Sequence, residues 1–429
     1  MQRATALDVF YGEELIGTVF DTEPLSFEYA PTWLARHQPS GPFPLSSIEL
    51  KPGRLAQPQV QAFFENLLPE GEVRAYLSAQ RKASTLFALL KEVAGDTAGA
   101  YVMLPQGQHP QPPQYEPTSW QAIADILKSR SAAAIQVQGE DARISLAGAQ
   151  DKATIAIFDG QPMLPKGHAP STHILKPDIR RLNKVRDSAV NEAIIMRTAK
   201  HCGLKTAEVF YEPMTRSCVV ERFDRLRRDD GGLSRVIQYD LCQLAGTVSE
   251  KKYEKEGGPG LEACARLIRK HSSRAAQDLQ ALVQWVFFNM YVGNNDSHAK
   301  NLSLYALPGQ GVRLTPFYDL MCTRIYPGLS KEFAFNVGGE VLPGQMGHAQ
   351  LQGMAQQLGM KPRYLQTVAE DVAVKVPAAI DQAVNEISPQ LAHSSQTFAE
   401  HLTHEVKSIT KKAQARFQRK TKKKKPPSG

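Results

Sequence analysis

The sequence predicts an α+β protein whose strands gather in the first half of the chain and whose helices gather in the second half. Two observations predict the strands. Residues 7–20 hold two alternating apolar runs, and residues 142–225 read as strand, strand, helix, strand, strand. A third predicts the helices, because apolar residues recur at helical spacing in residues 279–290. With 429 residues, the chain is long enough for two to three domains that each bury a core.

The first predicted domain spans residues 1–104 and is rich in strands. It opens with a β-hairpin, whose strands at residues 7–10 and 15–20 join through the turn around Gly12. Residues 105–117 are rich in proline, glutamine and histidine and contain almost no aliphatic side chains. This composition predicts a stiff, exposed connector between the first domain and the second.

Residues 118–225 form the second predicted domain, and residues 226–406 form the third, which is largely helical. In the second domain a helix begins at Asp187 and Ser188 and ends at Gly203. Its strands are predicted at residues 153–158, 173–176, 209–211 and 218–221. In the third domain, helices are predicted up to Gly293 and at residues 347–358 and 377–402, with a short strand at residues 333–337.

Basic charge gathers at the C-terminus. The formal net charge is +8, but ten lysine and arginine residues lie between Lys407 and Lys425 without a single acid, so the first 406 residues carry −2. Because this run shows no apolar face and ends in Pro-Pro-Ser-Gly, residues 407–429 are predicted to be a disordered tail. For such a tail, a solvated end is favoured over a contact with nucleic acid.

The composition excludes several classes of protein. The longest apolar stretch, residues 282–292, is interrupted by Gln284 and Asn289 and is far shorter than the ~20 residues of a membrane span. The N-terminus lacks the apolar segment of an export signal. Five scattered cysteines without a C-x-x-C pair imply neither a disulfide framework nor a zinc site. We therefore expect a cytoplasmic protein without a membrane partner.

Three oxygen-bearing residues follow the strongest predicted helix. Asp296 and Asn301 are five positions apart, and Asp319 comes eighteen positions later. This spacing is typical of a kinase catalytic loop and its metal-binding aspartate. Phosphoryl transfer needs one carboxylate to accept a hydroxyl proton, which suits Asp296, and oxygen ligands for Mg²⁺, which suit Asn301 and Asp319. Taken alone, an aspartate and asparagine at this spacing are also common in turns and helix caps.

The order of two upstream motifs supports a kinase. Lys176 ends an apolar strand and Glu192 lies in the next helix, the pair with which kinases hold the α- and β-phosphates. The alternative is a surface lysine at a strand end. Glu221, Arg222 and Phe223 end the last strand, where a two-lobed kinase has the hinge that meets adenine. The alternative there is an edge strand with charged ends.

No G-x-G-x-x-G motif precedes these strands. Residues 145–152, Ser-Leu-Ala-Gly-Ala-Gln-Asp-Lys, stand in its place and contain one glycine. Small residues still let backbone N–H groups approach phosphate oxygens, and Lys152 adds positive charge. A phosphate-binding turn is feasible here, although the motif alone is weak.

Six ordered segments resemble the HipA-type toxins, which are serine/threonine protein kinases of bacterial toxin–antitoxin pairs. These segments are residues 146–152, 220–225, 240–243, 252–260, 296–301 and 314–319. The resemblance begins at the N-terminal hairpin, includes Leu-Leu-Pro-Glu-Gly at residues 67–71, and continues loosely to about residue 400. It implies a two-lobed kinase with an added N-terminal subdomain, using ATP and Mg²⁺.

The resemblance also implies roles for individual residues. Asp296 would be the catalytic base, with Asn301 and Asp319 as the Mg²⁺ ligands and Lys176 on the phosphates. Autophosphorylation of Ser145 would switch the enzyme off. The other nucleotide contacts would be Ala147, Gly148, Ala149, Gln150, Asp151, Lys152, Glu221, Arg222, Phe223, His298, Ala299, Lys300 and Tyr318. The chain departs from the family pattern at Ser297, where relatives have glycine, and at Tyr239, where an acidic residue is familiar.

Partners are implied by the resemblance alone. We expect a small DNA-binding antitoxin that neutralises the kinase, with operator DNA reached mainly through that antitoxin. The expected protein substrate is an aminoacyl-tRNA synthetase, with the glutamate enzyme as a candidate, so that translation and growth stop. Two alternatives stay open: a non-catalytic corepressor on operator DNA, whose basic tail contacts phosphates, and a kinase of small molecules.

Overall fold

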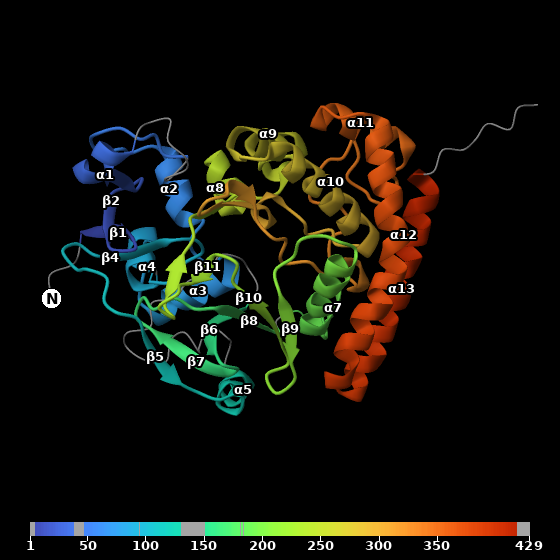
Figure 1. Ribbon diagram of the computed structural model, residues 1–429, viewed down its shortest axis with the longest axis horizontal. Helices are drawn as coiled ribbons and strands as arrows, with labels where there is room; N and C mark the ends of the chain where they lie inside the picture. Colours follow the sequence, from blue (N-terminus) through green and yellow to red (C-terminus); the bar gives the residue numbers. More distant parts are fainter. Residues whose placement is uncertain are drawn as a thin grey trace, which may run out of the picture.

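The computed structural model describes residues 5–37, 47–93, 95–129, 151–180, 182 and 184–417 (Figure 1). Ser145 and the predicted phosphate-turn residues 147–150 lie outside these ranges. Within them, no helix combines the length and the apolar character that a bilayer crossing requires.

The N-terminal subdomain is an antiparallel four-stranded sheet in the order β3-β2-β1-β4, with helices packed beside it (Figure 1). The predicted hairpin is present, and Gly12 takes a positive φ of 60° in its turn. The strands are β1 (Ala6–Tyr11), β2 (Glu14–Phe20), β3 (Ser26–Tyr29) and β4 (Tyr101–Pro105). The helices are α1 (Pro31–Arg36), α2 (Pro58–Glu65), α3 (Gly71–Gln80) and α4 (Leu86–Val93).

A six-stranded antiparallel sheet, in the order β5-β7-β6-β8-β10-β9, forms the second part. Its strands are β5 (Gln114–Pro117), β6 (Ala153–Phe158), β7 (Gln161–Lys166), β8 (His173–Pro177), β9 (Val209–Glu212) and β10 (Ser217–Glu221). Helices α5 (Trp120–Ser129) and α7 (Ser188–His201) accompany it. The predicted connector over residues 105–117 is largely exposed, as expected, but its last four residues form β5, which pairs with β7. Strand β7 was not predicted, since Pro162 and Pro165 conceal its pattern.

The third part is mainly helical, and its helix α12 packs against α7 of the second part. Its α-helices are α8 (Leu241–Ala245), α9 (Leu261–His271), α10 (Ala275–Val292), α11 (His348–Leu358), α12 (Pro362–Ile387) and α13 (His393–Phe417). Short 3₁₀ turns are η1 (Ser249–Lys251), η2 (Glu254–Glu256), η3 (Ala299–Asn301), η4 (Thr323–Ile325) and η5 (Ser388–Gln390). Its strands are β11 (Arg225–Arg227), β12 (Leu233–Arg235), β13 (Gln238–Asp240), β14 (Ser303–Leu307) and β15 (Gly311–Leu314).

Two boundary predictions in this part are wrong and one is correct. Gly293 ends α10 in the left-handed conformation, with φ +73°, as predicted. The predicted helix over residues 377–402 is two helices, because α12 ends at Ile387 and the chain turns through Pro389 before α13 begins. The predicted strand at residues 333–337 is only an isolated bridge between Val337 and Glu340.

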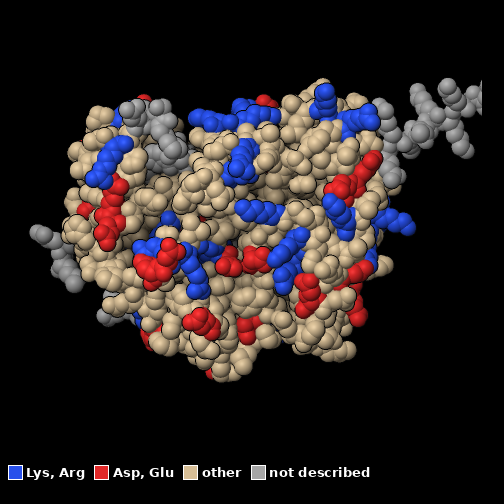
Figure 2. Space-filling model, in the orientation of Figure 1, with Lys and Arg blue, Asp and Glu red and all other residues tan. Residues whose placement is uncertain are grey.

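The predicted disordered tail at residues 407–429 is wrong for its first eleven residues, which belong to α13. Ile409, Ala413 and Phe417 recur every four residues and are buried, and the Phe417 ring lies 5.8 Å from that of Phe287 on α10. The basic residues between them concealed this apolar stripe. On the face that Figure 2 shows, basic side chains are more frequent along the upper edge, over α9 and α11, and acidic side chains are more frequent in the lower half.

Candidate active site

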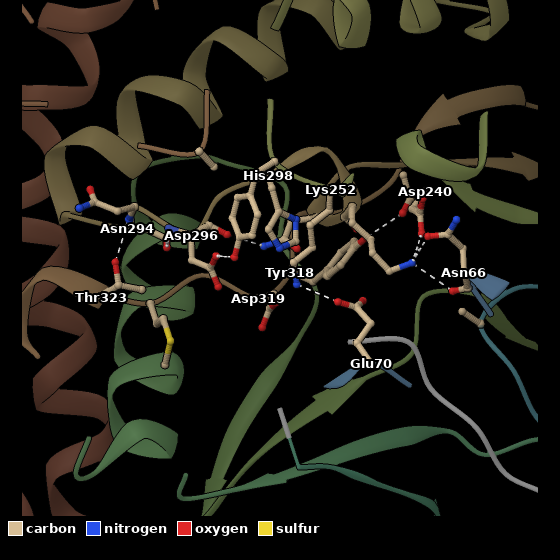
Figure 3. A pocket seen from close by; sticks show the side chains of 18 of the residues that line it. Asn66, Glu70, Asp240, Lys252, Asn294, Asp296, His298, Tyr318, Asp319 and Thr323 are labelled. Carbon is tan, nitrogen blue, oxygen red and sulfur yellow. Dashed lines mark hydrogen bonds and ion pairs between the residues drawn. The ribbon is translucent and has the colours of Figure 1, made fainter. Parts of the chain in front are cut away.

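A cleft with a volume of about 880 Å³ opens where the three parts of the molecule meet (Figure 3). Asn66 and Glu70 reach it from the N-terminal subdomain. The predicted site residues that line it are Lys152, Lys176, Glu221, Arg222, Phe223, Asp296, His298, Lys300, Asn301, Tyr318 and Asp319. Of the described predicted residues, Asp151 and Ala299 do not line it, and Ala299 is fully buried in the core. This volume suits a ligand of nucleotide size.

The lysine at the end of β8 forms the central ion pairs of the cleft. Lys176 Nζ lies 2.6 Å from Glu192 Oε1 on α7 and 2.7 Å from Asp319 Oδ1. Lys176 is 5% exposed, which excludes an ordinary surface lysine. Burial alone would lower the pKa of Lys176, but the two carboxylates hold that pKa above its ordinary value. A strand end and a helix thus present a fixed cation.

Asp319 reaches this pair from an uncommon backbone conformation. Its φ is +60°, in the left-handed region that residues other than glycine seldom adopt. Phe317, two residues earlier, stacks on Trp285, with ring centroids 6.0 Å apart, and so anchors the turn. Burial alone would raise the pKa of Asp319, but Lys176 and Lys152 hold that pKa well below its usual range. Because 41% of its side chain remains exposed, the charged carboxylate still faces the cleft.

Lys152 lies among the same charges. Burial, followed by repulsion from Lys176, lowers the pKa of Lys152 to about 8. A polyanionic ligand beside this amine would favour its charged form. Lys152 is therefore suited to bind phosphate oxygens.

The loop after α10 presents Asp296 to the cleft. The Asp296 N–H donates to Asn294 Oδ1 at 3.2 Å, and the Asn295 N–H donates to Thr323 Oγ1 at 2.8 Å. Asn301 Nδ2 donates to the backbone oxygen of Asp296 at 3.2 Å, which leaves its amide oxygen as the possible metal ligand. Asp296 is an exposed residue that lines the cleft.

Sequence reasoning missed Tyr253, Lys252 and Glu70. The Tyr253 hydroxyl donates to Asp296 Oδ1 at 2.5 Å, and its ring lies edge-on to His298 with centroids 5.2 Å apart. Lys252 Nζ lies 2.8 Å from Glu70 Oε2. Burial, followed by the Lys252 charge, holds the pKa of His298 well below its ordinary value, so the ring is neutral. The family resemblance of their segments was the available signal for the three missed residues.

Two predicted nucleotide residues have side-chain charges that are neutralised inside the protein. Lys300 Nζ donates to Asn66 Oδ1 at 2.6 Å and to Asp240 Oδ2 at 2.9 Å. The Arg222 guanidinium donates to both carboxylate oxygens of Asp224, at 2.9 and 2.8 Å. Both cations therefore hold the protein's own segments together at the cleft wall.

One end of the cleft is apolar. Ile174, Val220 and Phe223 line it, and the Phe223 ring lies 5.6 Å from that of Tyr318. The Tyr318 hydroxyl donates to the backbone oxygen of Lys300 at 3.0 Å, so its ring is fixed. A flat aromatic base is the kind of group that such a surface accepts.

Asn301 and Asp319 both offer oxygen atoms to this cleft. Within the described residues, no three histidine, cysteine or carboxylate side chains gather as a metal cage. Mg²⁺ is usually held by one or two carboxylates together with phosphate oxygens and water rather than by a complete protein cage. The two oxygen donors therefore fit Mg²⁺ bound together with a nucleotide.

The two departures from the family pattern have structural explanations. The Ser297 hydroxyl donates to the backbone oxygen of Asn294 at 3.3 Å, within the catalytic loop. Tyr239 is buried, and its hydroxyl pairs with that of Tyr101 from the N-terminal subdomain. Neither side chain removes an oxygen ligand from the cleft.

Known proteins with matching sequence cover most of this chain. Residues 7–104 match the HipA N-terminal domain, and residues 144–380 match the HipA-like C-terminal domain. The Sinorhizobium fredii protein named "Putative kinase Y4mE" is 36% identical over 78% of this chain and 81% of its own length. The Shewanella oneidensis serine/threonine-protein kinase toxin HipA is 29% identical over 93% of this chain and 94% of its own.

A solved structure shows the same fold. It is the complex of HipA, HipB and operator DNA from Shewanella oneidensis MR-1, with a TM-score of 0.78 and 26% identity over 94% of this chain and 96% of that chain. The α+β, two-lobed fold implied by the resemblance is thereby confirmed. The chain belongs to the HipA family of kinases.

Proposed function

We propose that this kinase transfers the terminal phosphoryl group of ATP to a serine or threonine hydroxyl of a protein. The observation that carries the proposal is the arrangement of one cleft, in which Lys176 pairs with Glu192 and Asp319 while Asp296 lines the same cleft and accepts a hydrogen bond from Tyr253. A non-catalytic corepressor would have no need of this intact set.

Each side chain has a role that its position supports. Asp296 accepts the proton of the acceptor hydroxyl, and Lys176 binds phosphate oxygens while Glu192 keeps it in place. Asn301 and Asp319 would hold Mg²⁺, which would neutralise charge on the phosphates. Catalysis by this chain is mainly positioning and charge stabilisation, since no side chain needs to form a covalent bond with the phosphoryl group.

The biological setting follows the relatives. A DNA-binding antitoxin partner is supported by the solved complex of HipA with HipB and operator DNA. We propose that such an antitoxin neutralises this kinase and that operator DNA is reached through it. We further propose an aminoacyl-tRNA synthetase as substrate, with the glutamate enzyme as first candidate, so that released kinase arrests translation and leaves the cell dormant.

Ser145 is proposed as an autoregulatory site, on sequence alone. It precedes residues 147–152, where we expect the phosphates of ATP to bind. A phosphate on Ser145 would add about −1.5 to −2 charges beside that turn and repel the ligand. The kinase would thus switch itself off.

The experiment compares the wild type with Asp296→Asn, before and after brief induction in cells and after incubation with Mg-ATP. Phosphoproteomics and mass spectrometry should find substrate phosphorylation and phosphate on Ser145 in the wild type and neither in Asp296→Asn. Asp381→Asn, an exposed carboxylate on α12, is the matched control and should behave as wild type. Normal transfer by folded Asp296→Asn would overturn the kinase mechanism, and an unmodified Ser145 in active protein would remove only the switch.

A further inference from the structure

A loop of the N-terminal subdomain enters the catalytic cleft. Helix α2 ends at Glu65 and α3 begins at Gly71, and the residues between them bring Asn66 and Glu70 to the cleft wall. Asn66 is 1% exposed and Glu70 is 8% exposed. Polar groups buried to this degree are costly unless they are paired, so their partners indicate what the loop does.

Asn66 is held in a single orientation. Its Nδ2 donates to the backbone oxygens of Ala62 at 2.7 Å and Thr247 at 2.8 Å. Because both amide hydrogens are used, Oδ1 is turned toward Lys300, whose Nζ donates to it at 2.6 Å and to the Asn66 backbone oxygen at 3.1 Å. The residue after Lys300 is Asn301, so this contact holds the end of the catalytic loop.

Glu70 connects to the other end of the same loop. Its Oε2 accepts from Lys252 Nζ at 2.8 Å, and the next residue, Tyr253, donates its hydroxyl to Asp296 Oδ1 at 2.5 Å. The Lys252 ammonium also lies 5.5 Å from the centroid of the Tyr253 ring. The Lys252 and Tyr253 side chains thus connect Glu70 to the proposed base.

We propose that the N-terminal subdomain completes the catalytic site: Asn66 positions Asn301 through Lys300, and Glu70 positions Asp296 through Lys252 and Tyr253. This inference rests on the proposed function. Both are positioning residues, because neither contacts the reacting atoms. The loop they hold contains no regular structure except the short turn η3, so side-chain contacts must fix its geometry. A displacement of about 1 Å at such a loop costs on the order of a hundredfold in rate.

A rival explanation is that Asn66 and Glu70 merely attach the subdomain to the rest of the protein. The two explanations differ in kinetics. Loosened attachment lowers the melting temperature without changing turnover by the folded protein, whereas a misplaced base lowers kcat and leaves ATP binding largely intact.

The test uses the full chain, with Asn66→Ala and Glu70→Gln compared with Tyr101→Phe. Tyr101 contributes a hydroxyl contact across the same subdomain boundary, to Tyr239, and does not line the cleft. We expect Asn66→Ala and Glu70→Gln to lower kcat about tenfold to a hundredfold with a less than about threefold change in KM for ATP. Tyr101→Phe should keep kcat near the wild-type value even if its melting temperature falls.

A double-mutant cycle tests the connection from Glu70 to the base. Glu70→Gln and Tyr253→Phe should each lower kcat. The kcat of the double variant should be no lower than that of the slower single variant. A rise in kcat for Tyr253→Phe would mean that the phenol obstructs Asp296, and it would overturn the proposal.

Failure of this inference is distinguishable from failure of the proposed function. If the wild type transfers phosphate, Asp296→Asn is inactive, and folded Asn66→Ala and Glu70→Gln both turn over at the wild-type rate, the positioning role is excluded while the kinase stands. If the wild type transfers no phosphate, the proposed function itself fails. Should Asn66→Ala not fold, Glu70→Gln and the cycle with Tyr253→Phe decide the outcome.

Discussion

Two groups of charges contribute residues to the cleft wall, and they differ in whether every carboxylate oxygen has a hydrogen-bond partner. The junction cluster joins the N-terminal subdomain to the hinge and consists of Asp96, Arg222, Asp224, Arg225 and Arg235. The cleft cluster consists of Lys176, Glu192 and Asp319. In the junction cluster no side chain is more than 9% exposed, whereas Asp319 in the cleft cluster is 41% exposed.

The junction cluster uses every carboxylate oxygen it contains. Asp96 Oδ1 lies 2.7 Å from Arg225, and its Oδ2 accepts from Ser171 Oγ at 2.7 Å and from Arg222 at 3.3 Å. Asp224 accepts from Arg222 on both oxygens and from the N–H of Gly99 at 2.7 Å. No acceptor remains for a ligand, which marks this cluster as structural.

The cleft cluster contains carboxylate oxygens that can still accept hydrogen bonds or bind a cation. Glu192 Oε2 is buried and has no hydrogen-bond partner among the described residues, and Asp319 keeps an exposed carboxylate while its pKa is held low. Charged groups that are concentrated but incompletely satisfied are typical of sites that await a ligand. The comparison teaches that the satisfaction of the carboxylates, rather than burial or charge alone, separates framework from site.

Asp319→Asn should produce the largest loss of activity. It removes the proposed metal ligand and the charge opposite Lys176, so phosphate transfer should fall on the order of a thousandfold or more. The free energy of unfolding should fall by less than it does for Asp96→Asn, because Lys176 keeps Glu192 as a partner and the Asp319 carboxylate is partly exposed. Initial-rate kinetics and urea unfolding of the same preparation measure both effects. A large loss of stability with retained transfer would reverse the assignment of the two clusters.

Asp96→Asn should lower stability strongly and leave phosphate transfer nearly unchanged. Removing this carboxylate leaves three buried arginines with only Asp224 to balance them, and breaking a buried ion pair typically costs about 3–5 kcal/mol. Urea unfolding should therefore show a marked loss of stability. Transfer per folded molecule should stay near the wild-type value, provided that assays are run well below the new midpoint. A stable but inactive Asp96→Asn would place the junction cluster in the catalytic machinery.

Acid should weaken the junction cluster in a defined range. The arginines outweigh burial and lower the pKa of Asp224 from 3.8 to about 2. As the pH falls, Asp224 is protonated near pH 4 in the unfolded chain but only near pH 2 in the folded chain. Stability that is fully present above pH 4 is therefore lost as the pH falls toward 2, by about 2 kcal/mol from this residue.

Urea midpoints between pH 6 and pH 2.5 measure this loss. Asp224→Asn should be less stable than the wild type at pH 6 but should lose about 2 kcal/mol less on acidification. Burial raises the pKa of Glu192, so protonation of this residue stabilises the folded state as the pH falls. Glu192 therefore cannot cause the expected loss of stability in acid. Equal acid slopes in both proteins would contradict the charge balance argued for the junction.

Much of the fold could be read from local patterns. Strands β6, β8, β9 and β10 fall within one or two residues of the predicted runs, because β-branched residues are bounded there by turn residues. The helix ending at Gly293 was equally clear. Asp296, Asn301 and Asp319 were found because two of them are close in sequence and the third follows one hairpin later.

Other features depend on contacts that a local pattern does not encode. Glu70 meets Lys252 across 182 positions, and Tyr253 meets Asp296 across 43. No periodicity links such pairs. Lys300 and Arg222 look like ligand-binding cations in the sequence, yet folding places acids beside them that neutralise both. The reach of the N-terminal subdomain into the cleft was therefore visible only in the structure.

The smallest effect is expected from removing residues 418–429. This deletion takes away six basic residues that follow the last buried contact of α13, at Phe417, so phosphate transfer and melting temperature should stay near the wild-type values. Deleting residues 407–429 is the contrasting variant. It also removes Ile409, Ala413 and Phe417, whose burial against the helical core contributes several kcal/mol. Thermal unfolding and kinase assays of both truncations distinguish the effect of charge from that of packing. Loss of phosphate transfer on removing residues 418–429 would give the basic end a catalytic role. An unchanged melting temperature without residues 407–429 would show that the apolar stripe of α13 does not support the fold.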